Sequence, residues 1–169
     1  MSNLQTPEGL RTPKSFTVVV DNREQLPYSF KGYDCTVEQG TLYTADYSIA
    51  GLEELIAIEV KHSLSDLIGC MTSDRDRFKH NLLRLQGYKA KAVIIEANLS
   101  DIVQQLYRSK IGFNSIVGSI SSWTIRYGVP FIFAGDRAGG ELMTFSLLSN
   151  FYRQCVEFSK SLNLSLIHI

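Results

Sequence analysis

At 169 residues the chain has the length of one ordinary domain, because single cores divide into several domains only beyond roughly 250 residues. Hydrophobic residues make up 44% and charged residues 20% of the sequence, which is typical of globular proteins and excludes disordered or fibrous classes. The longest apolar runs are far shorter than the ~20 residues of a membrane-spanning helix. The formal net charge is zero, so any attraction to nucleic acid would depend on local charge clusters.

The two ends of the chain differ in character from its middle. Residues 1–15 are polar, contain two prolines and have no apolar segment of the kind a secretory signal requires. We therefore predict a flexible leader, one domain over residues 16–162 and a cytoplasmic location. Residues 163–169 end on an apolar run that resembles a non-native tail. The three cysteines are widely spaced without a C-x-x-C pair, which indicates neither a disulfide framework nor a zinc site.

The first half of the chain alternates strand patterns with loops. Residues 15–21 form a β-branched run typical of a buried strand, and a loop follows to residue 35. Residues 40–51 predict a short strand or turn that enters a hairpin, and residues 55–60 the next strand. The apolar period then becomes helical, with Ser63 or Ser65 as the N-cap.

The remaining segments predict helices and strands in alternation. A helix begins near Ser73 or Asp74, ends near Gly87 and buries Phe78, Leu82, Leu83 and Leu85. A strand over 91–97, a short helix capped by Ser100, a helix capped by Asn114, a strand over 129–135 and a long helix over 138–162 follow. This alternation predicts a layered α/β sheet with right-handed crossovers. The helical stripe that contains Trp123 indicates packing in the core or in a dimer.

Basic residues gather in one short region despite the neutral total. Between residues 75 and 91 there are six Lys or Arg against one acidic residue. This region forms either a solvated helix face or a surface that follows phosphates. The candidate DNA contacts are Arg75, Arg77, Lys79 and Arg84, with Arg108, Lys110, Arg126 and Arg137 further along the chain.

Glu59 and Lys61 stand two residues apart at the end of the strand IAIEVK. Alternate side chains of a strand share a face, so the carboxylate and the amine lie on the same side, about 7 Å apart along the backbone. The pair is either a surface salt bridge or part of a site. Asp21 and Asp46 also stand at strand ends or turns. Mg²⁺ or Mn²⁺ prefers such carboxylates, and a neighbouring lysine can orient the water that attacks phosphorus.

Five segments in order strengthen the second interpretation: VVVDNRE (18–24), ADYS (45–48), IEVKHSLSDLIGCM (58–71), and the stretches 77–97 and 107–135. Together they resemble the nuclease domain of XPF-type structure-specific endonucleases, part of the PD-(D/E)xK superfamily, in its small bacterial and phage form. The resemblance covers about residues 16–158. It implies a restriction-endonuclease-like mixed sheet flanked by helices in three layers.

The resemblance also implies roles for single residues. Asp46 and Glu59 would hold Mg²⁺ or Mn²⁺, with the Val60 carbonyl as a further candidate ligand, and Lys61 would position the nucleophilic water. Asp21 and Asp66 would be accessory acids. The first motif would be completed by Arg23 and Glu24.

The sequence departs from the family pattern at three points. Ala45 replaces a glycine, which is a mild change if the turn does not require φ > 0. Val60 stands where the family has arginine, and one extra residue separates Lys61 from Asp66. A shifted alignment would match Val60, Lys61 and His62 to the motif and would predict an inactive protein. We prefer the alignment that keeps Glu59, and we expect His62 to be an exposed residue at the helix start.

The predicted function is therefore metal-dependent hydrolysis of DNA at flap or fork junctions, in repair or recombination. The alternative is an inactive DNA-binding or dimer-scaffold domain, and RNA or linear duplex ends are a third substrate class. The resemblance further implies a homodimer formed through the last two helices, and the last helix has more apolar surface than one core face uses. We expect no membrane partner.

Overall fold

The structure is a computed structural model that describes residues 15–166, with side chains through residue 162. The predicted leader therefore lies outside the described residues, except for Ser15. The predicted tail spans residues 163–169. Its last three residues, and the side chains of residues 163–166, lie outside the described part of the chain. No described helix combines the length and the apolar character needed to cross a bilayer.

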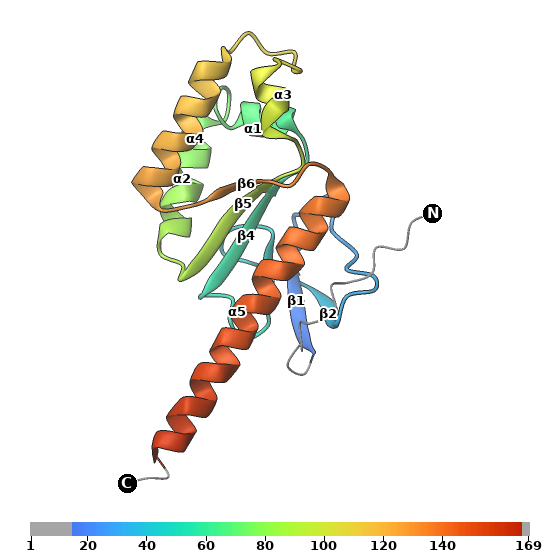
Figure 1. Cartoon of the computed structure of the whole chain (residues 1–169), viewed down its shortest axis with the longest axis vertical. Helices are drawn as coiled ribbons and strands as arrows, with labels where there is room; N and C mark the ends of the chain where they lie inside the picture. The colour runs from blue at the N-terminus through green and yellow to red at the C-terminus, as the bar shows by residue number, and fades with distance from the viewer. Residues whose placement is uncertain (1–14, 167–169) are drawn as a thin grey trace.

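A mixed sheet forms the centre of the molecule, as predicted, and it has six strands (Figure 1). The strands are β1 (Phe16–Asp21), β2 (Cys35–Gly40), β3 (Tyr47–Ile49), β4 (Ile56–Lys61), β5 (Ala90–Ile95) and β6 (Phe131–Phe133). Their order across the sheet is β2-β1-β3-β4-β5-β6. Only β3 runs antiparallel to its neighbours β1 and β4, and the other pairs are parallel.

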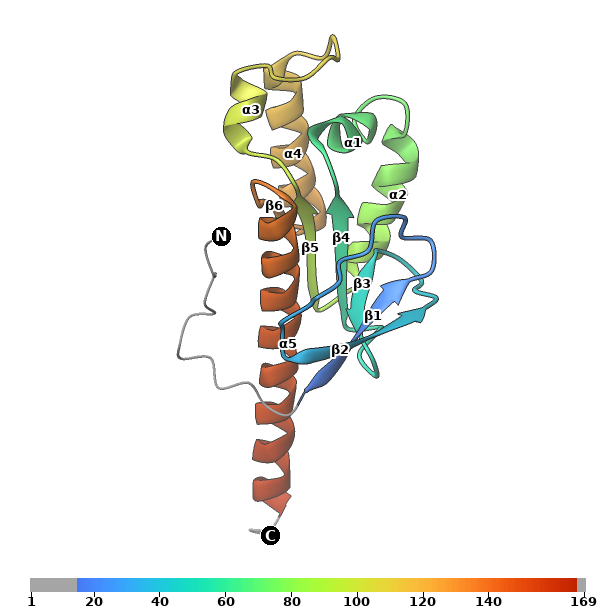
Figure 2. The same ribbon diagram turned by 90° about the vertical axis from the view of Figure 1, so that its right-hand side faces the viewer.

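Helices cover both faces of this sheet, which gives the three predicted layers (Figure 2). One face carries α1 (Leu64–Gly69), α2 (Arg75–Gln86), α3 (Leu99–Val103) and α4 (Phe113–Tyr127). The other face carries α5 (Arg137–Leu166), whose C-terminal part extends beyond the sheet (Figures 1 and 2).

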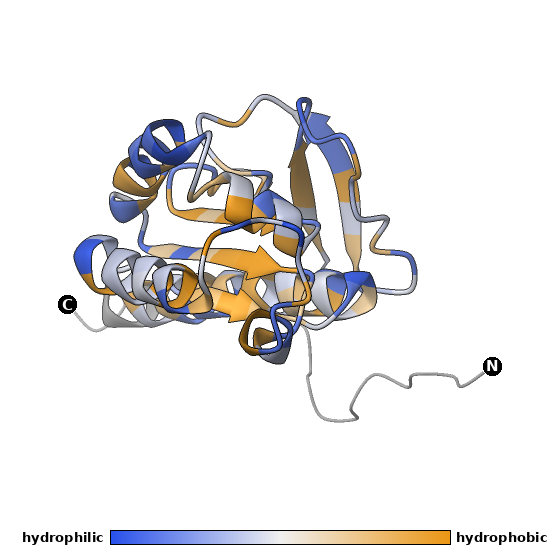
Figure 3. Cartoon of the chain, turned by 90° about the horizontal axis from the view of Figure 1, so that it is seen from above, coloured by the Kyte–Doolittle hydropathy of each residue, from blue (hydrophilic) through white to orange (hydrophobic). Residues whose placement is uncertain are grey.

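Strict alternation along the central strands divides the apolar residues between two cores. In β4, Ala57 packs under α1 and α2, whereas Ile58 and Val60 pack under α5. In β5, Val93 faces the first core and Ile94 the second. Hydrophobic residues are accordingly concentrated in the central strands (Figure 3). Because every second residue of β4 faces α1 and α2, the side chains of Glu59 and Lys61 are placed on that face.

Several local predictions are confirmed and others are wrong. Ser63 caps α1 by accepting a 3.1 Å hydrogen bond from the Asp66 N–H. Trp123 is 2% exposed and packs in the core. Leu83, however, is 57% exposed, because the buried stripe of α2 passes through Phe78, Leu82 and Leu85.

The helix starts differ as well. Asn98 replaces Ser100 as the N-cap of α3, and its N–H donates to the Asp101 carboxylate at 3.0 Å. Gly112, not Asn114, precedes α4. The edge strand β2 is absent from the sequence prediction because it is mostly exposed and has no buried apolar stripe.

Candidate active site

The pairing of β3 with β4 brings Asp46 to the end of β4. Tyr47 is in register with Ile58, and the Asp46 N–H donates to the Ile58 carbonyl at 3.0 Å. The Asp46 side chain then turns toward the strand and accepts a 2.7 Å hydrogen bond from the Val60 N–H. The carboxylate therefore accepts a hydrogen bond from β4 that a carbonyl of a neighbouring strand would otherwise accept. As a result, Asp46 and Glu59 share one cleft.

Glu59 and Lys61 form a close ion pair inside this cleft rather than on the open surface. Their Oε1 and Nζ atoms lie 2.7 Å apart, and the side chains are 10% and 16% exposed. The Lys61 ammonium lies 5.1 Å from the centre of the Phe78 ring. Burial alone would lower the pKa of Lys61, but the Glu59 carboxylate raises it above the usual value. Lys61 is therefore a cation at every physiological pH.

Asp46 is the carboxylate of the cleft whose pKa is most strongly shifted. Burial and the nearby Glu59 carboxylate raise the pKa of Asp46 to about 8, although the Val60 N–H favours the charged form. Burial and the second carboxylate therefore both disfavour the charged form of Asp46. A group with this property in a cleft is a candidate for function, because a bound cation would relieve the repulsion.

Asp21 holds the wall of the cleft in place. Its two carboxylate oxygens accept hydrogen bonds from the Arg23 N–H, from Arg23 Nε at 2.6 Å and Nη2 at 3.1 Å, and from the Leu42 N–H at 2.7 Å. Burial would raise the pKa of Asp21, but these donors lower it below the usual value. The same guanidinium also donates to the Leu42 carbonyl at 2.8 Å. Asp21 thus lines the cleft and fixes both Arg23 and the loop before Asp46.

The cleft has a volume of about 310 Å³ and opens to solvent. Its walls come from β1, β4, α2 and the loop between β2 and β3. The lining residues are Asp21, Arg23, Tyr43, Thr44, Ala45, Asp46, Glu59, Lys61, Cys70, Asp74, Arg77, Phe78, Asn81 and Arg84. The structure therefore brings Asp21, Asp46, Glu59 and Lys61 together in one cleft.

Other predicted residues lie elsewhere. Asp66 is exposed in the first turn of α1 and does not line the cleft. Arg75 contacts the Ser119 hydroxyl at 3.3 Å and stacks on Trp123 at 5.1 Å, so it fastens α2 to α4. The Lys79 ammonium lies 3.7 Å from the carboxylate of Asp76, which is on the same helix, α2. Of the six basic residues in this region, Arg77 and Arg84 line the cleft.

The candidates from the later part of the chain divide in the same way. Arg108 and Lys110 are exposed in the loop between α3 and α4, outside the cleft. Arg126 lies in the last turn of α4, near the Tyr127 ring. Arg137 donates to the Leu26 and Pro27 carbonyls at 3.0 and 2.8 Å, which gives it a structural contact.

The alanine at position 45 would be a mild change in a turn without positive φ, but the structure shows a positive φ there. Ala45 is buried and has a φ of +67°, in the left-handed region. A non-glycine residue there costs about 1 kcal/mol. The turn that delivers Asp46 thus retains the glycine-like backbone while carrying an alanine.

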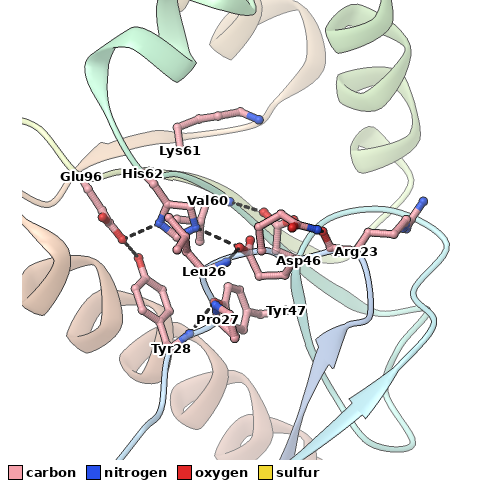
Figure 4. Close-up of polar contacts among 12 residues, drawn as sticks. Arg23, Leu26, Pro27, Tyr28, Asp46, Tyr47, Val60, Lys61, His62 and Glu96 are labelled. Atoms are coloured by element: carbon pink, nitrogen blue, oxygen red, sulfur yellow. Dashed lines mark hydrogen bonds and ion pairs between the residues drawn. The ribbon is translucent and has the colours of Figure 1, made fainter.

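The prediction that His62 is exposed is wrong. Its ring, 16% exposed, lies between two carboxylates, with Nε2 at 3.2 Å from Glu24 and Nδ1 at 2.9 Å from Glu96 (Figure 4). The Tyr28 hydroxyl donates to the same Glu96 oxygen at 2.7 Å. His62 follows Lys61 in the chain and therefore points to the opposite face, toward α5. Glu24 serves this cluster and does not line the cleft.

Sequence reasoning missed Asn81 and Thr44. Asn81 donates from Nδ2 to Glu59 Oε2 at 3.0 Å, and the Thr44 hydroxyl hydrogen-bonds to Asn81 Oδ1. A signal for Asn81 was present, because it is a polar residue between Phe78 and Leu85 on the side of α2 that faces the sheet. Thr44 carried no comparable signal. Together they orient one Glu59 oxygen while Lys61 holds the other.

The mixed sheet, its flanking helices and the carboxylate–lysine cleft define the class of protein, an α/β domain with the XPF nuclease fold. The family model of the ERCC4 domain matches residues 20–160, and the chain belongs to this family. No curated protein matches the sequence significantly.

Two solved structures of XPF from Aeropyrum pernix share the fold. The first has a TM-score of 0.62 and 23% identity, and the match covers 78% of this chain and 59% of that chain. The second, a complex with DNA, has a TM-score of 0.62 and 20% identity, with coverage of 82% and 66%. The chain therefore spans less than two thirds of either relative.

Proposed function

We propose that this chain is a metal-dependent DNA endonuclease that hydrolyses phosphodiester bonds near junctions of duplex and single strand. One observation carries the proposal: Asp46, Glu59 and Lys61, from a turn and a strand end, line the same open cleft. Membership of the ERCC4 domain family supports the activity. The relative in complex with DNA supports the substrate class.

The donor set of the cleft fits Mg²⁺ or Mn²⁺. No three His, Cys, Asp or Glu side chains gather into a metal cluster in the described part of the chain. Magnesium typically binds through one or two carboxylates and completes its coordination with water and substrate phosphate, so Asp46 and Glu59 suffice. Burial and the Glu59 carboxylate raise the pKa of Asp46, and a bound cation would favour its charged form. When bound, the ion would polarise the phosphate and lower the pKa of a water.

Residues of the chain would provide the other catalytic and positioning roles. Lys61 is fixed by Glu59 and the Phe78 ring, so its ammonium can orient the attacking water and stabilise charge that develops on the phosphate. Asn81 keeps the Glu59 carboxylate in one orientation. The guanidinium groups of Arg77 and Arg84 supply positive charge for the neighbouring phosphates. As the family resemblance implies, the products would carry a 5′-phosphate and a 3′-hydroxyl.

An inactive DNA-binding scaffold of the same fold is the second candidate, and the position of Asp66 outside the cleft favours it. The valine at position 60, where the family has arginine, supports the inactive scaffold less than the sequence suggested. Val60 is 4% exposed and packs under α5, on the opposite face from the cleft. Its apolar character therefore removes no phosphate contact from the cleft.

We further propose a homodimer that involves α5. Leu142, Phe158 and Leu162 on this helix are 50%, 65% and 48% exposed. Continued apolar exposure along a helix that extends beyond the sheet is typical of an association surface. Phe158→Glu should convert a dimer to a monomer in light scattering, with Leu83→Glu, an exposed apolar residue on α2, as the matched control. A wild-type chain that is monomeric at micromolar concentrations would refute the dimer.

Cleavage of labelled flap, fork and plain duplex DNA in Mn²⁺ tests the enzymatic proposal. Wild-type protein should cleave the branched substrates, and Asp46→Asn, Glu59→Gln and Lys61→Met should each reduce the rate by at least about 10²-fold. Asp66→Asn is the control and should retain activity, because its carboxylate lies outside the cleft. Binding by all forms without cleavage by any would favour the scaffold.

A further inference from the structure

Tyr43 stands out at the rim of the cleft because of its exposure. It is 79% exposed, whereas its neighbours Leu42 and Thr44 are both 4% exposed. Loops usually turn aromatic rings inward, since burial of such a ring is favourable. Here the residues on both sides are buried, whereas Tyr43 faces solvent.

The loop that carries Tyr43 is fixed on both sides of the ring. The Leu42 N–H and carbonyl are bound by Asp21 at 2.7 Å and Arg23 at 2.8 Å. On the other side, the Thr44 hydroxyl hydrogen-bonds to Asn81 on α2. The ring is therefore presented by a rigid support rather than by a mobile loop, which lowers the entropic cost of binding to it.

Tyr43 is also connected to the reacting part of the cleft. Its neighbour Thr44 contacts Asn81, and Asn81 donates to Glu59 at 3.0 Å. The guanidinium of Arg84 lies 5.9 Å from the centre of the Tyr43 ring. The ring thus stands between solvent and the cleft that Arg77 and Arg84 line, where phosphates of a bound strand would lie.

Among the described residues, a second concavity beside Tyr43 contains acidic residues and no basic ones. It has a volume of about 450 Å³ and includes Glu53 and Glu54. A phosphate backbone that continued past Tyr43 in this direction would approach two carboxylates. These carboxylates disfavour a phosphate backbone in the second concavity, so a strand bound in the cleft would be directed away from it at Tyr43, where an unpaired base would be within reach of the ring.

We infer that Tyr43 stacks on an unpaired nucleobase next to the phosphodiester in the cleft, with Arg84 as its support, and so contributes preference for a junction over plain duplex. This inference rests on the proposed nuclease function and adds a specificity residue to it. Aromatic rings bind bases of any sequence, because each base has a π face. The preference would be for DNA structure and not for sequence.

A substrate cycle tests the stacking directly. Fluorescence anisotropy would measure binding of the full chain, without Mg²⁺ or Mn²⁺, to a forked DNA and to the same fork with an abasic site at the first unpaired nucleotide. Tyr43→Ala should weaken binding to the intact fork about 5- to 150-fold, the range for loss of one base stack. The abasic site should weaken wild-type binding similarly and should add little to the loss in Tyr43→Ala.

Two matched variants separate stacking from other effects. Tyr43→Phe keeps the π face and should bind within about twofold of the wild type, whereas Tyr43→Leu keeps apolar surface only and should resemble Tyr43→Ala. Equal binding by Tyr43→Ala and wild type, or losses from the variant and the abasic site that multiply, would overturn the inference. Cleavage in Mn²⁺ by a wild type that shows no Tyr43 effect would leave the nuclease proposal standing. Binding that depends on the unpaired base, without any cleavage, would refute only the nuclease proposal. Absence of DNA binding would refute both the nuclease proposal and the inference about Tyr43.

Discussion

Replacement of Asp46 by asparagine should stabilise the metal-free protein at alkaline pH. The pKa of this carboxyl is raised in the folded state to about 8 from an ordinary value of 3.8, because of burial and the Glu59 charge. A group with a raised folded pKa contributes stability that is fully present below the unfolded pKa and is lost as the pH rises through the folded pKa. The wild type should therefore lose stability between about pH 4 and pH 8 through Asp46.

The magnitude follows from the shift. One pKa unit corresponds to ~1.4 kcal/mol, so the shift sets an upper bound of several kcal/mol. Asp46 retains partial exposure at an open cleft, and water screens its charge, so we expect a gain of about 1–3 kcal/mol for Asp46→Asn at pH 9. The amide oxygen can still accept from the Val60 N–H. This gain corresponds to a rise in Tm of roughly 2–12 °C for a domain of this size.

Urea denaturation in EDTA at pH 5, 7 and 9 would measure the effect. The difference between variant and wild type should grow with pH, while the exposed Asp66→Asn control should differ from wild type by less than about 0.5 kcal/mol throughout. Millimolar Mn²⁺ should reverse the order, because only the wild type offers both carboxylates and gains binding free energy. A difference that does not change with pH, or an Asp46→Asn protein less stable than wild type at pH 9, would refute the reasoning.

Four further substitutions test the packing of the domain. Gly140→Ala should destabilise by about 1–3 kcal/mol in thermal unfolding, because the new methyl would lie 2.3 Å from the Tyr28 hydroxyl, whereas Gly118→Ala, with nothing within 4 Å, should stabilise α4 by about 0.5–1 kcal/mol. His62→Ala should cost about 1–3 kcal/mol, since it leaves two flanking carboxylates without their shared partner, and an unchanged urea midpoint would contradict this. Val60→Arg should restore the family motif but lower the free energy of unfolding by more than about 3 kcal/mol, because position 60 faces an apolar core. A stable, more active variant would show that this placement is wrong.

The sequence predicted those parts of the fold that depend on local patterns. The β-branched runs of β1, β4 and β5 identify buried strands, and the spacing of Glu59 and Lys61 alone places both on one face. The edge strand β2 could not be found in this way, because an exposed strand has no buried stripe. Its place is determined by pairing with β1.

The missed parts of the site depend on contacts between distant segments. His62 meets Glu24 and Glu96, which are 38 and 34 residues away in sequence, so no local pattern could indicate its burial. Asp46 reaches Glu59 only through the register of a three-residue strand. The positive φ of Ala45 likewise results from the turn that this register imposes.

The central claim is that Asp46, Glu59 and Lys61 form one cation-dependent hydrolytic site. Single-turnover cleavage of a flap DNA in Mn²⁺, with enzyme in excess of substrate, compares wild type and Glu59→Gln most directly. Saturating enzyme separates the chemical step from differences in binding. The account predicts cleavage by the wild type that EDTA abolishes and that Glu59→Gln slows by at least about 10²-fold. Equal rates for the two proteins, or a wild type that binds the flap and never cleaves it, would contradict it.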